Sequence, residues 1–485
     1  MDKPPEGSDI AALLNIFQYL NYKPEVQLKE NLTMADIFND RSYFESFYPS
    51  QERQYRKLLA ACADNPDFAN IVVLGESVSL PDPQTGKKYE LGGLKAGFYG
   101  DQRTGAVYAA FRGTGRREWL DNALASGGLT PASPQQMQAL VFFDAYIGGM
   151  AAKMQELSGK EPYAILTGHS KGGNKAQFAA MLTKHQDIVR AGISMDGQTM
   201  APETMEHMID ALGMEKFEKL RTEKLASVCG TNDFVHPLCH NAGDHRHADL
   251  TLPSALIPPE NTVYLKMDGA FGLNPANLHM PDAYVTGTGR LTALSEKGAL
   301  VKLMENISAS VMHLPPAARS LVTESVMWTA QFVHRAAPLG KEQFSLPKFA
   351  AGLNLFVVSA SAGLVKSLPA LTLELARQAA KAAAALVAGV MTRSLELINE
   401  AGKLGQAIKE MARRTPDLAG AAQLGTALTD AAQAAASLEV KPFAAMSFAE
   451  RVQWAKERSA QGGRPPGLPA PAQPAPPGRL SAREL

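Results

Sequence analysis

A serine framed by glycines is the residue of this sequence whose surroundings most directly suggest chemistry. Ser170 is the centre of the pentapeptide Gly-His-Ser-Lys-Gly (168–172), which follows the apolar stretch 163–167 and precedes the helix-forming stretch 174–184. A serine on a sharp strand-to-helix turn projects its hydroxyl from the end of a sheet, and small neighbours let the backbone make that turn. The following helix adds a favourable dipole and N–H groups where an oxyanion develops. The segment therefore predicts a nucleophilic serine, with a glycine-rich phosphate-binding loop as the alternative.

A second segment, upstream of the serine, supports the nucleophile. Arg112-Gly113-Thr114 ends an apolar stretch, and the run Glu-Trp-Leu-Asp-Asn follows at 118–122. Taken with residues 167–173, this order of motifs resembles the class 3 (fungal-type) lipase family of α/β hydrolases. The resemblance covers about residues 70–285 and implies an oxyanion hole made by Thr114 and the backbone N–H of Lys171. Two such donors stabilise the charge that develops on a carbonyl oxygen during acyl transfer.

The sequence departs from that family at two places. Lys171 follows the serine where the lipases usually carry leucine, and Met-Asp-Gly-Gln at 195–198 matches their next turn only loosely. The elbow Gly-His-Ser-Lys-Gly-Gly-Asn is closer to an uncharacterised bacterial branch of related hydrolases.

The acid of a catalytic triad is expected after the serine, in a loop that follows a strand. Asp233 lies in such a loop, after the strand predicted at 225–229, and Asp233-Phe234-Val235 matches a family pattern. Asp196 is the rival because it also ends a predicted strand. We favour Asp233 and expect Asp196 to shape its turn through side-chain hydrogen bonds.

The general base must be a histidine later in the chain. His279 lies on a late loop after the strand predicted at 262–265, and Asp282 and Tyr284 follow it as in the resembling families. The other candidates lie so close to Asp233 that the chain would have to double back; they are His236, His240, His245 and His247. These four and Cys239 could ligate zinc, but their spacing fits no established zinc pattern. We therefore favour His279, expect a lid loop at 236–247, and predict no metal and no cofactor.

The elements that must position these residues alternate between strands and helices, which is typical of a parallel α/β sheet. Strands are predicted at 71–74, 163–167, 191–195 and 225–229, a hairpin at 95–100 and 106–111, and helices at 137–157 and 174–184. The fold class is then α/β, an α/β-hydrolase-type mostly parallel sheet followed by an α-helical domain. The predicted domains are 1–292 with an N-terminal helical lead-in, an alanine- and leucine-rich helical domain at 293–440, and 441–485 as a helix with a proline-rich disordered tail.

Composition limits the classes of function. The chain of 485 residues is 45% hydrophobic, so it can bury a sizeable core, and its 48 basic and 48 acidic residues give no overall field for nucleic acid. Three cysteines argue against a disulfide framework. The N-terminus has no apolar run behind a basic start, so we expect cytoplasmic synthesis without a signal peptide, and export by a signal-independent route stays open.

Two uncharged runs in the helical half, 349–365 and 382–392, are shorter than the ~20 apolar residues that a membrane-spanning helix needs. They predict packed helices, with peripheral membrane contact through 349–392 as the alternative. The whole pattern predicts a serine hydrolase that cleaves a carboxylic ester, of a lipid in particular. A thioesterase, a small-ester esterase, or a non-catalytic interaction or effector protein working through the helical half are the alternatives.

Overall fold

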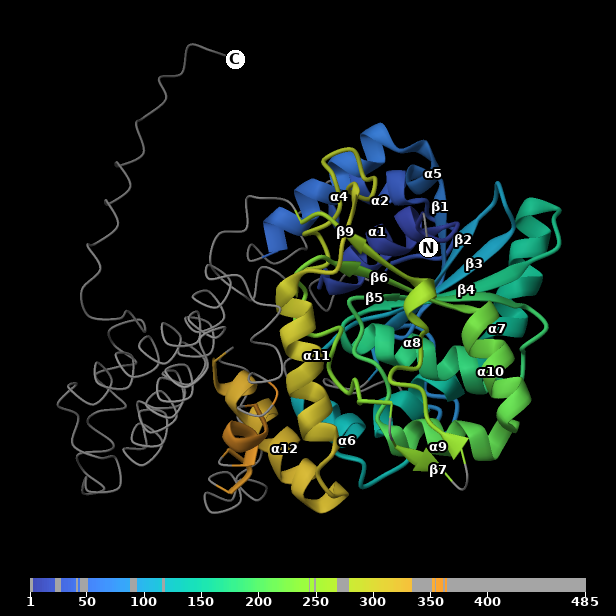
Figure 1. Cartoon of the computed structure of the whole chain (residues 1–485). Helices are drawn as coiled ribbons and strands as arrows, with labels where there is room; N and C mark the ends of the chain where they lie inside the picture. Colours follow the sequence, from blue (N-terminus) through green and yellow to red (C-terminus); the bar gives the residue numbers. More distant parts are fainter. Residues whose placement is uncertain are drawn as a thin grey trace, which may run out of the picture.

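The structure is a computed structural model of the chain (Figure 1). It describes residues 3–21, 28–40, 42–43, 51–87, 94–115, 118–243, 245–247, 250–267, 279–333, 351–353, 355–360 and 363. Among these residues an eight-stranded sheet forms the centre of the protein, with the strand order β1-β2-β3-β4-β5-β6-β9-β10. The five central strands, from β3 to β9, are parallel, and the strands outside them pair antiparallel.

The strands that carry the sheet are short, and the described helices lie before, between and after them. The strands are β1 (Ile71–Glu76), β2 (Ala96–Asp101), β3 (Ala106–Phe111), β4 (Tyr163–His169), β5 (Val189–Met195), β6 (Leu225–Gly230), β9 (Thr262–Leu265) and β10 (Leu294–Ser295), with a separate pair β7 (Arg246–His247) and β8 (Leu250–Thr251). The helices are α1 (Ser8–Tyr19), α2 (Met34–Asn39), α4 (Glu52–Asp64), α5 (Pro66–Ala69), α6 (Trp119–Gly127), α7 (Pro134–Ser158), α8 (Lys171–Leu182), α9 (Pro202–Leu212), α10 (Met214–Glu223), α11 (Ala299–Met312) and α12 (Pro316–Val333).

Alternation along the central strands divides the core into two halves. In β4, Ile165 packs into one hydrophobic cluster, whereas Ala164 and Leu166 pack into the other. Successive strand residues point to opposite faces, so a sheet covered on both sides has apolar residues at every position. The first cluster contains α1, which packs on β3, β4 and β5, and the second contains α7 and α8 (Figure 1).

Helix α7, beside the site, has a clear sequence signal for each of its ends. Ser133 and Gln136 form a capping box at the start of α7, where Pro134 occupies the first turn, and Gly159 ends the helix in the left-handed conformation. Such caps satisfy backbone groups that the helix itself leaves unpaired. The sequence therefore defines where α7 starts. Its N-cap residue, Ser133, contacts the side chain of Lys171, the residue after Ser170.

The described helices that follow residue 292 pack on the part of the chain that contains the sheet. Helix α12 lies along α6, and Thr323 Oγ1 donates a hydrogen bond of 3.2 Å to the carbonyl of Ala123. Leu353 is buried, and Phe356 packs against the cluster of Cys239, Val311, Met312 and Val322. The described part of the run 349–365 thus contacts protein, while the run 382–392 and the segment 441–485 lie outside the described residues. No described helix is long and apolar enough to cross a membrane.

The α/β fold class predicted from the sequence is confirmed. The predicted strands and the hairpin correspond to β1 to β6, and the predicted helices to α7 and α8. Helix α8 begins at Lys171, three residues before the predicted stretch, so the helix starts directly behind the serine.

Candidate active site

Ser170 lies on a strained turn between β4 and α8. It has φ 58° and ψ −127°, a positive-φ backbone conformation that non-glycine residues rarely adopt and that clusters at functional sites. A Cβ on Gly168 would stand well inside 3.0 Å of the Gly172 carbonyl, and a Cβ on Gly172 would equally overlap the carbonyl of Phe111. Both positions therefore require glycine, because the neighbouring backbone leaves no room for a side chain. The turn has the geometry of a nucleophile elbow.

The carboxyl ends of the parallel strands bring an acid and a histidine to the same edge of the sheet. Asp233 follows β6, and its Oδ2 lies 2.6 Å from Nδ1 of His279. The other oxygen of Asp233 accepts from the backbone N–H groups of Val235 at 3.0 Å and His236 at 2.6 Å. The carboxylate is fully buried and held at both oxygens, so it fixes the orientation of the imidazole.

His279 also lies close to the elbow. Its ring centroid is 4.7 Å from that of His169, the residue before the serine. Its Nε2 is buried and hydrogen bonds to no described residue. An imidazole with Nδ1 on a carboxylate and Nε2 unbonded can accept a proton through Nε2.

Tyr19, at the end of α1, is a component of the site that the sequence did not reveal. Its hydroxyl lies 2.9 Å from Nδ1 of His169, and a Cβ on Gly113 would overlap that hydroxyl. Burial raises the pKa of Tyr19, so the hydroxyl keeps its proton. Burial, followed by the charge of His279, lowers the pKa of His169 well below its usual value. Tyr19 thus joins the elbow to the Arg112–Thr114 turn through uncharged groups.

The rival acid, Asp196, is also buried at this edge of the sheet. Its Oδ1 accepts from the Gly230 backbone N–H at 2.8 Å, and it has φ 46°. Burial first, and then the charge of Asp233, raise the pKa of Asp196 well above its usual value. A raised pKa disfavours the negative charge that an imidazolium needs from its partner. The bond to the strand end agrees with a role in shaping the turn, as expected from the sequence.

The other candidate histidines lie elsewhere. Nε2 of His236 is 3.4 Å from the hydroxyl of Tyr264, and Nε2 of His247 is 2.8 Å from Oδ1 of Asp210. His240 is mostly buried, and burial lowers its pKa, as it does for His236. The ring of His245 contacts that of His313 at 5.7 Å. Of the five imidazole rings, only that of His279 hydrogen bonds to the predicted acid, since His236 contacts Asp233 through its backbone N–H.

One group of side chains among the described residues could hold a metal by distance alone. Potential ligand atoms of His169, Asp196 and His279 lie within 4.8 Å of one another. The ring planes of the two histidines are tilted at 34° to each other. Nδ1 of His279 is bonded to Asp233, and Nδ1 of His169 is bonded to Tyr19. We therefore interpret the group as part of an acid–base site.

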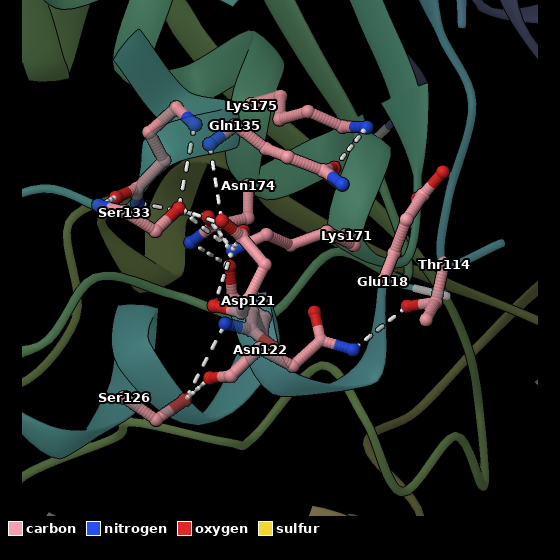
Figure 2. Close-up of polar contacts among 12 residues, drawn as sticks. Thr114, Glu118, Asp121, Asn122, Ser126, Ser133, Gln135, Lys171, Asn174 and Lys175 are labelled. Atoms are coloured by element: carbon pink, nitrogen blue, oxygen red, sulfur yellow. Dashed lines mark hydrogen bonds and ion pairs between the residues drawn. The ribbon is translucent and has the colours of Figure 1, made fainter. Parts of the chain in front are cut away.

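The Arg112–Thr114 turn lies against the elbow and is held by the segment that follows it. Arg112 pairs with Glu118 at 2.6 Å. Nδ2 of Asn122 donates to Oγ1 of Thr114 at 2.8 Å (Figure 2). Since Thr114 Oγ1 accepts this bond, its own proton is available for another acceptor. The backbone N–H of Lys171 belongs to the first turn of α8, where no intrahelical acceptor exists. The hydroxyl of Thr114 and the backbone N–H of Lys171 can therefore each donate a further hydrogen bond, and their roles as oxyanion donors stay predictions.

The side chain of Lys171 makes a connection that the sequence did not predict. Its Nζ lies 2.9 Å from Oδ2 of Asp121 in the first turn of α6, and the lysine side chain is completely buried (Figure 2). Burial alone would raise the pKa of Asp121. The charge of Lys171, together with hydrogen bonds from Lys171, Gln135 and Ser133, outweighs burial and lowers that pKa. The signal that could have suggested this pair is the lysine at a position where the resembling lipases carry leucine.

Comparison with known proteins adds little to this picture. No family model and no curated protein matches the chain. Among solved structures, the chain is similar to the Lip2 lipase from Yarrowia lipolytica, with a TM-score of 0.31 and 13% sequence identity over 61% of this chain and 96% of that one. A likeness this low carries no argument about activity, so the function must be argued from the site.

Proposed function

We propose that this chain is a serine hydrolase that cleaves a carboxylic ester. The observation that carries the proposal is the hydrogen bond of 2.6 Å between His279 and Asp233 at the strand edge where Ser170 occupies a strained elbow. Its partners are 46 residues apart in the chain, and Asp233 lies 233 − 170 = 63 positions after the serine. The tertiary fold, and not the local sequence, therefore brings these residues together.

In the proposed mechanism, Nε2 of His279 removes the proton of Ser170, whose Oγ attacks the ester carbonyl. Asp233 keeps the proton of His279 on Nδ1 and stabilises the imidazolium that forms. The developing oxyanion accepts from Thr114 and from the backbone N–H of Lys171. The imidazolium then protonates the leaving alcohol, and water releases the acyl group by the same steps in reverse.

A lipid ester is the substrate class that we propose. The ring centroid of Phe234 lies 5.6 Å from that of His279, so an apolar side chain borders the histidine. The motif order also resembles that of lipases. A thioester or a small soluble ester would pass through the same acyl-enzyme, so chain-length preference must separate these substrates.

The test is hydrolysis of p-nitrophenyl esters of increasing acyl length, with labelling by a fluorophosphonate probe, which reacts only with an activated serine. We expect Ser170→Ala to abolish both labelling and turnover. The matched control is Ser227→Ala, which removes another buried serine at the sheet and should leave both intact. Unchanged turnover in Ser170→Ala would remove the proposal, and absence of labelling in the wild-type protein would favour a non-catalytic role.

A further inference from the structure

Lys171 carries a charge into the interior immediately beside the proposed nucleophile. Transfer of an ammonium group from water to the protein interior is unfavourable unless a partner and further hydrogen bonds compensate for it. Asp121 is that partner, at 2.9 Å. Longer contacts join Nζ to Oγ of Ser133 at 3.3 Å and to Oδ1 of Asn174 at 3.4 Å. The carboxylate of Asp121 and these hydrogen bonds therefore compensate for the burial of the ammonium group.

The side chain of Asp121 links three helices. It belongs to the first turn of α6, and it accepts from Ser133 Oγ at 2.8 Å and from the backbone N–H of Gln135 at 3.0 Å, at the start of α7. Lys171 is the first residue of α8. The ion pair is thus the point where the elbow, the start of α7 and the start of α6 are joined (Figure 2).

The start of α6 also carries the residue that holds Thr114. Asn122 is adjacent to Asp121, and its Nδ2 donates to Thr114 Oγ1 at 2.8 Å. A continuous path of contacts therefore runs from Lys171 through Asp121 and Asn122 to Thr114. Lys171 and Thr114 are the two residues that supply donors to the oxyanion in the proposed function.

We propose that the buried pair of Lys171 and Asp121 is a positioning device that sets the distance between the two oxyanion donors. The inference rests on the proposed function. The lysine side chain holds α6 against the elbow, while the backbone of the same residue donates to the oxyanion. Any displacement of Asp121 moves Asn122 and Thr114 relative to Ser170. The pair itself touches no substrate, so it acts only through these groups.

The structure supplies a control for packing and charge in the neighbouring lysine of the same helix. Lys175 is also completely buried, but its Nζ donates to Oε1 of Gln135 at 3.0 Å rather than pairing with α6 (Figure 2). Its removal deletes a buried ammonium group that contacts only the side chain of Gln135 on this path, whereas the bond from Gln135 to Asp121 comes from the Gln135 backbone N–H. A general effect of losing a buried lysine would appear in both positions, whereas a positioning effect would appear only at Lys171.

The experiment compares the double variant Lys171→Met/Asp121→Asn with Lys175→Met in the full chain. The double variant leaves no unpaired buried charge, and the amide oxygen can still accept from Gln135. We expect kcat for a p-nitrophenyl ester to fall about 10- to 100-fold, with KM changed less than about twofold, because oxyanion donors act on the transition state. Fluorophosphonate labelling should slow in parallel, and Lys175→Met should keep the wild-type kcat.

Several outcomes would overturn the inference. A folded double variant with wild-type kcat, or an equal loss of kcat in Lys175→Met, would show that the pair contributes only to packing. If the double variant does not fold, the variant Asp121→Glu provides the test, because it keeps both charges but lengthens the side chain that joins α6 to Lys171. A wild-type kcat in Asp121→Glu would refute the positioning role of the pair. Hydrolysis that persists in Ser170→Ala defeats the proposed function and this inference together, whereas Ser170-dependent hydrolysis with an unaffected double variant defeats the inference alone.

Discussion

The substitution Asp233→Asn tests which carboxylate orients the base. The new amide keeps the size of the aspartate, and its surroundings dictate its orientation. The oxygen Oδ1 accepts from the backbone N–H groups of Val235 and His236 at 3.0 and 2.6 Å, so the amide oxygen must occupy that side. The amide nitrogen then faces Nδ1 of His279, at the position of the present 2.6 Å bond.

The predicted magnitude follows from the tautomer. An amide N–H donates, so Nδ1 of His279 must accept, and the ring proton moves to Nε2. The histidine can then no longer take the proton of Ser170. Loss of the correct tautomer in a Ser-His-Asp hydrolase lowers kcat by about 10⁴-fold, which corresponds to about 5.4 kcal/mol of activation free energy. The fold should persist because no buried group loses its partner.

The assay is kcat for a p-nitrophenyl ester, with circular dichroism as the check on folding. Asp196→Asn is the matched control, because burial raises the pKa of Asp196 and so favours its neutral form, which an amide resembles. We expect it to change kcat less than about tenfold, an indirect effect through the nearby strand end. The reasoning is refuted if Asp196→Asn loses the activity and Asp233→Asn retains it, since Asp196 would then be the acid.

Three further predictions follow from the site and its supports. His279→Ala should remove turnover while His247→Ala, at the surface, leaves kcat unchanged; the reverse result would identify another base. Gly172→Ala should lower the unfolding free energy by about 3 kcal/mol in urea titration because its Cβ overlaps backbone, whereas Gly148→Ala, which meets nothing within 4 Å, should not destabilise. Burial lowers the pKa of Lys175 from 10.5 to about 8. Between these pH values the unfolded chain therefore binds more protons than the folded protein does. The unfolding free energy should then rise by about 3 kcal/mol from pH 8 to 10.5, relative to that of Lys175→Met. Equal pH slopes for the two proteins would contradict the Lys175 prediction.

The sequence by itself determined the local part of the site. An apolar strand, a small-residue turn and a helix-forming stretch are all contained in residues 163–184, and together they predict the elbow at Ser170. The need for glycine at 168 can also be predicted from the sequence. The backbone that a Cβ on Gly168 would overlap belongs to Gly172, only four residues away. Alternation of strands and helices likewise predicted the parallel sheet, since each βα unit is a local pattern.

Only the tertiary structure decided which distant groups meet. Five histidines after Asp233 were open from spacing, and the pairing with His279 depends on where a loop returns over the sheet edge. Tyr19 reaches His169 across 150 residues, and Lys171 finds Asp121 on a helix that precedes it by 50. These contacts depend on how helices pack on the sheet, and packing is non-local. A buried lysine and a solvated one have the same letter in the sequence; the carboxylate that compensates its charge exists as a partner only after α6 and α8 have come together.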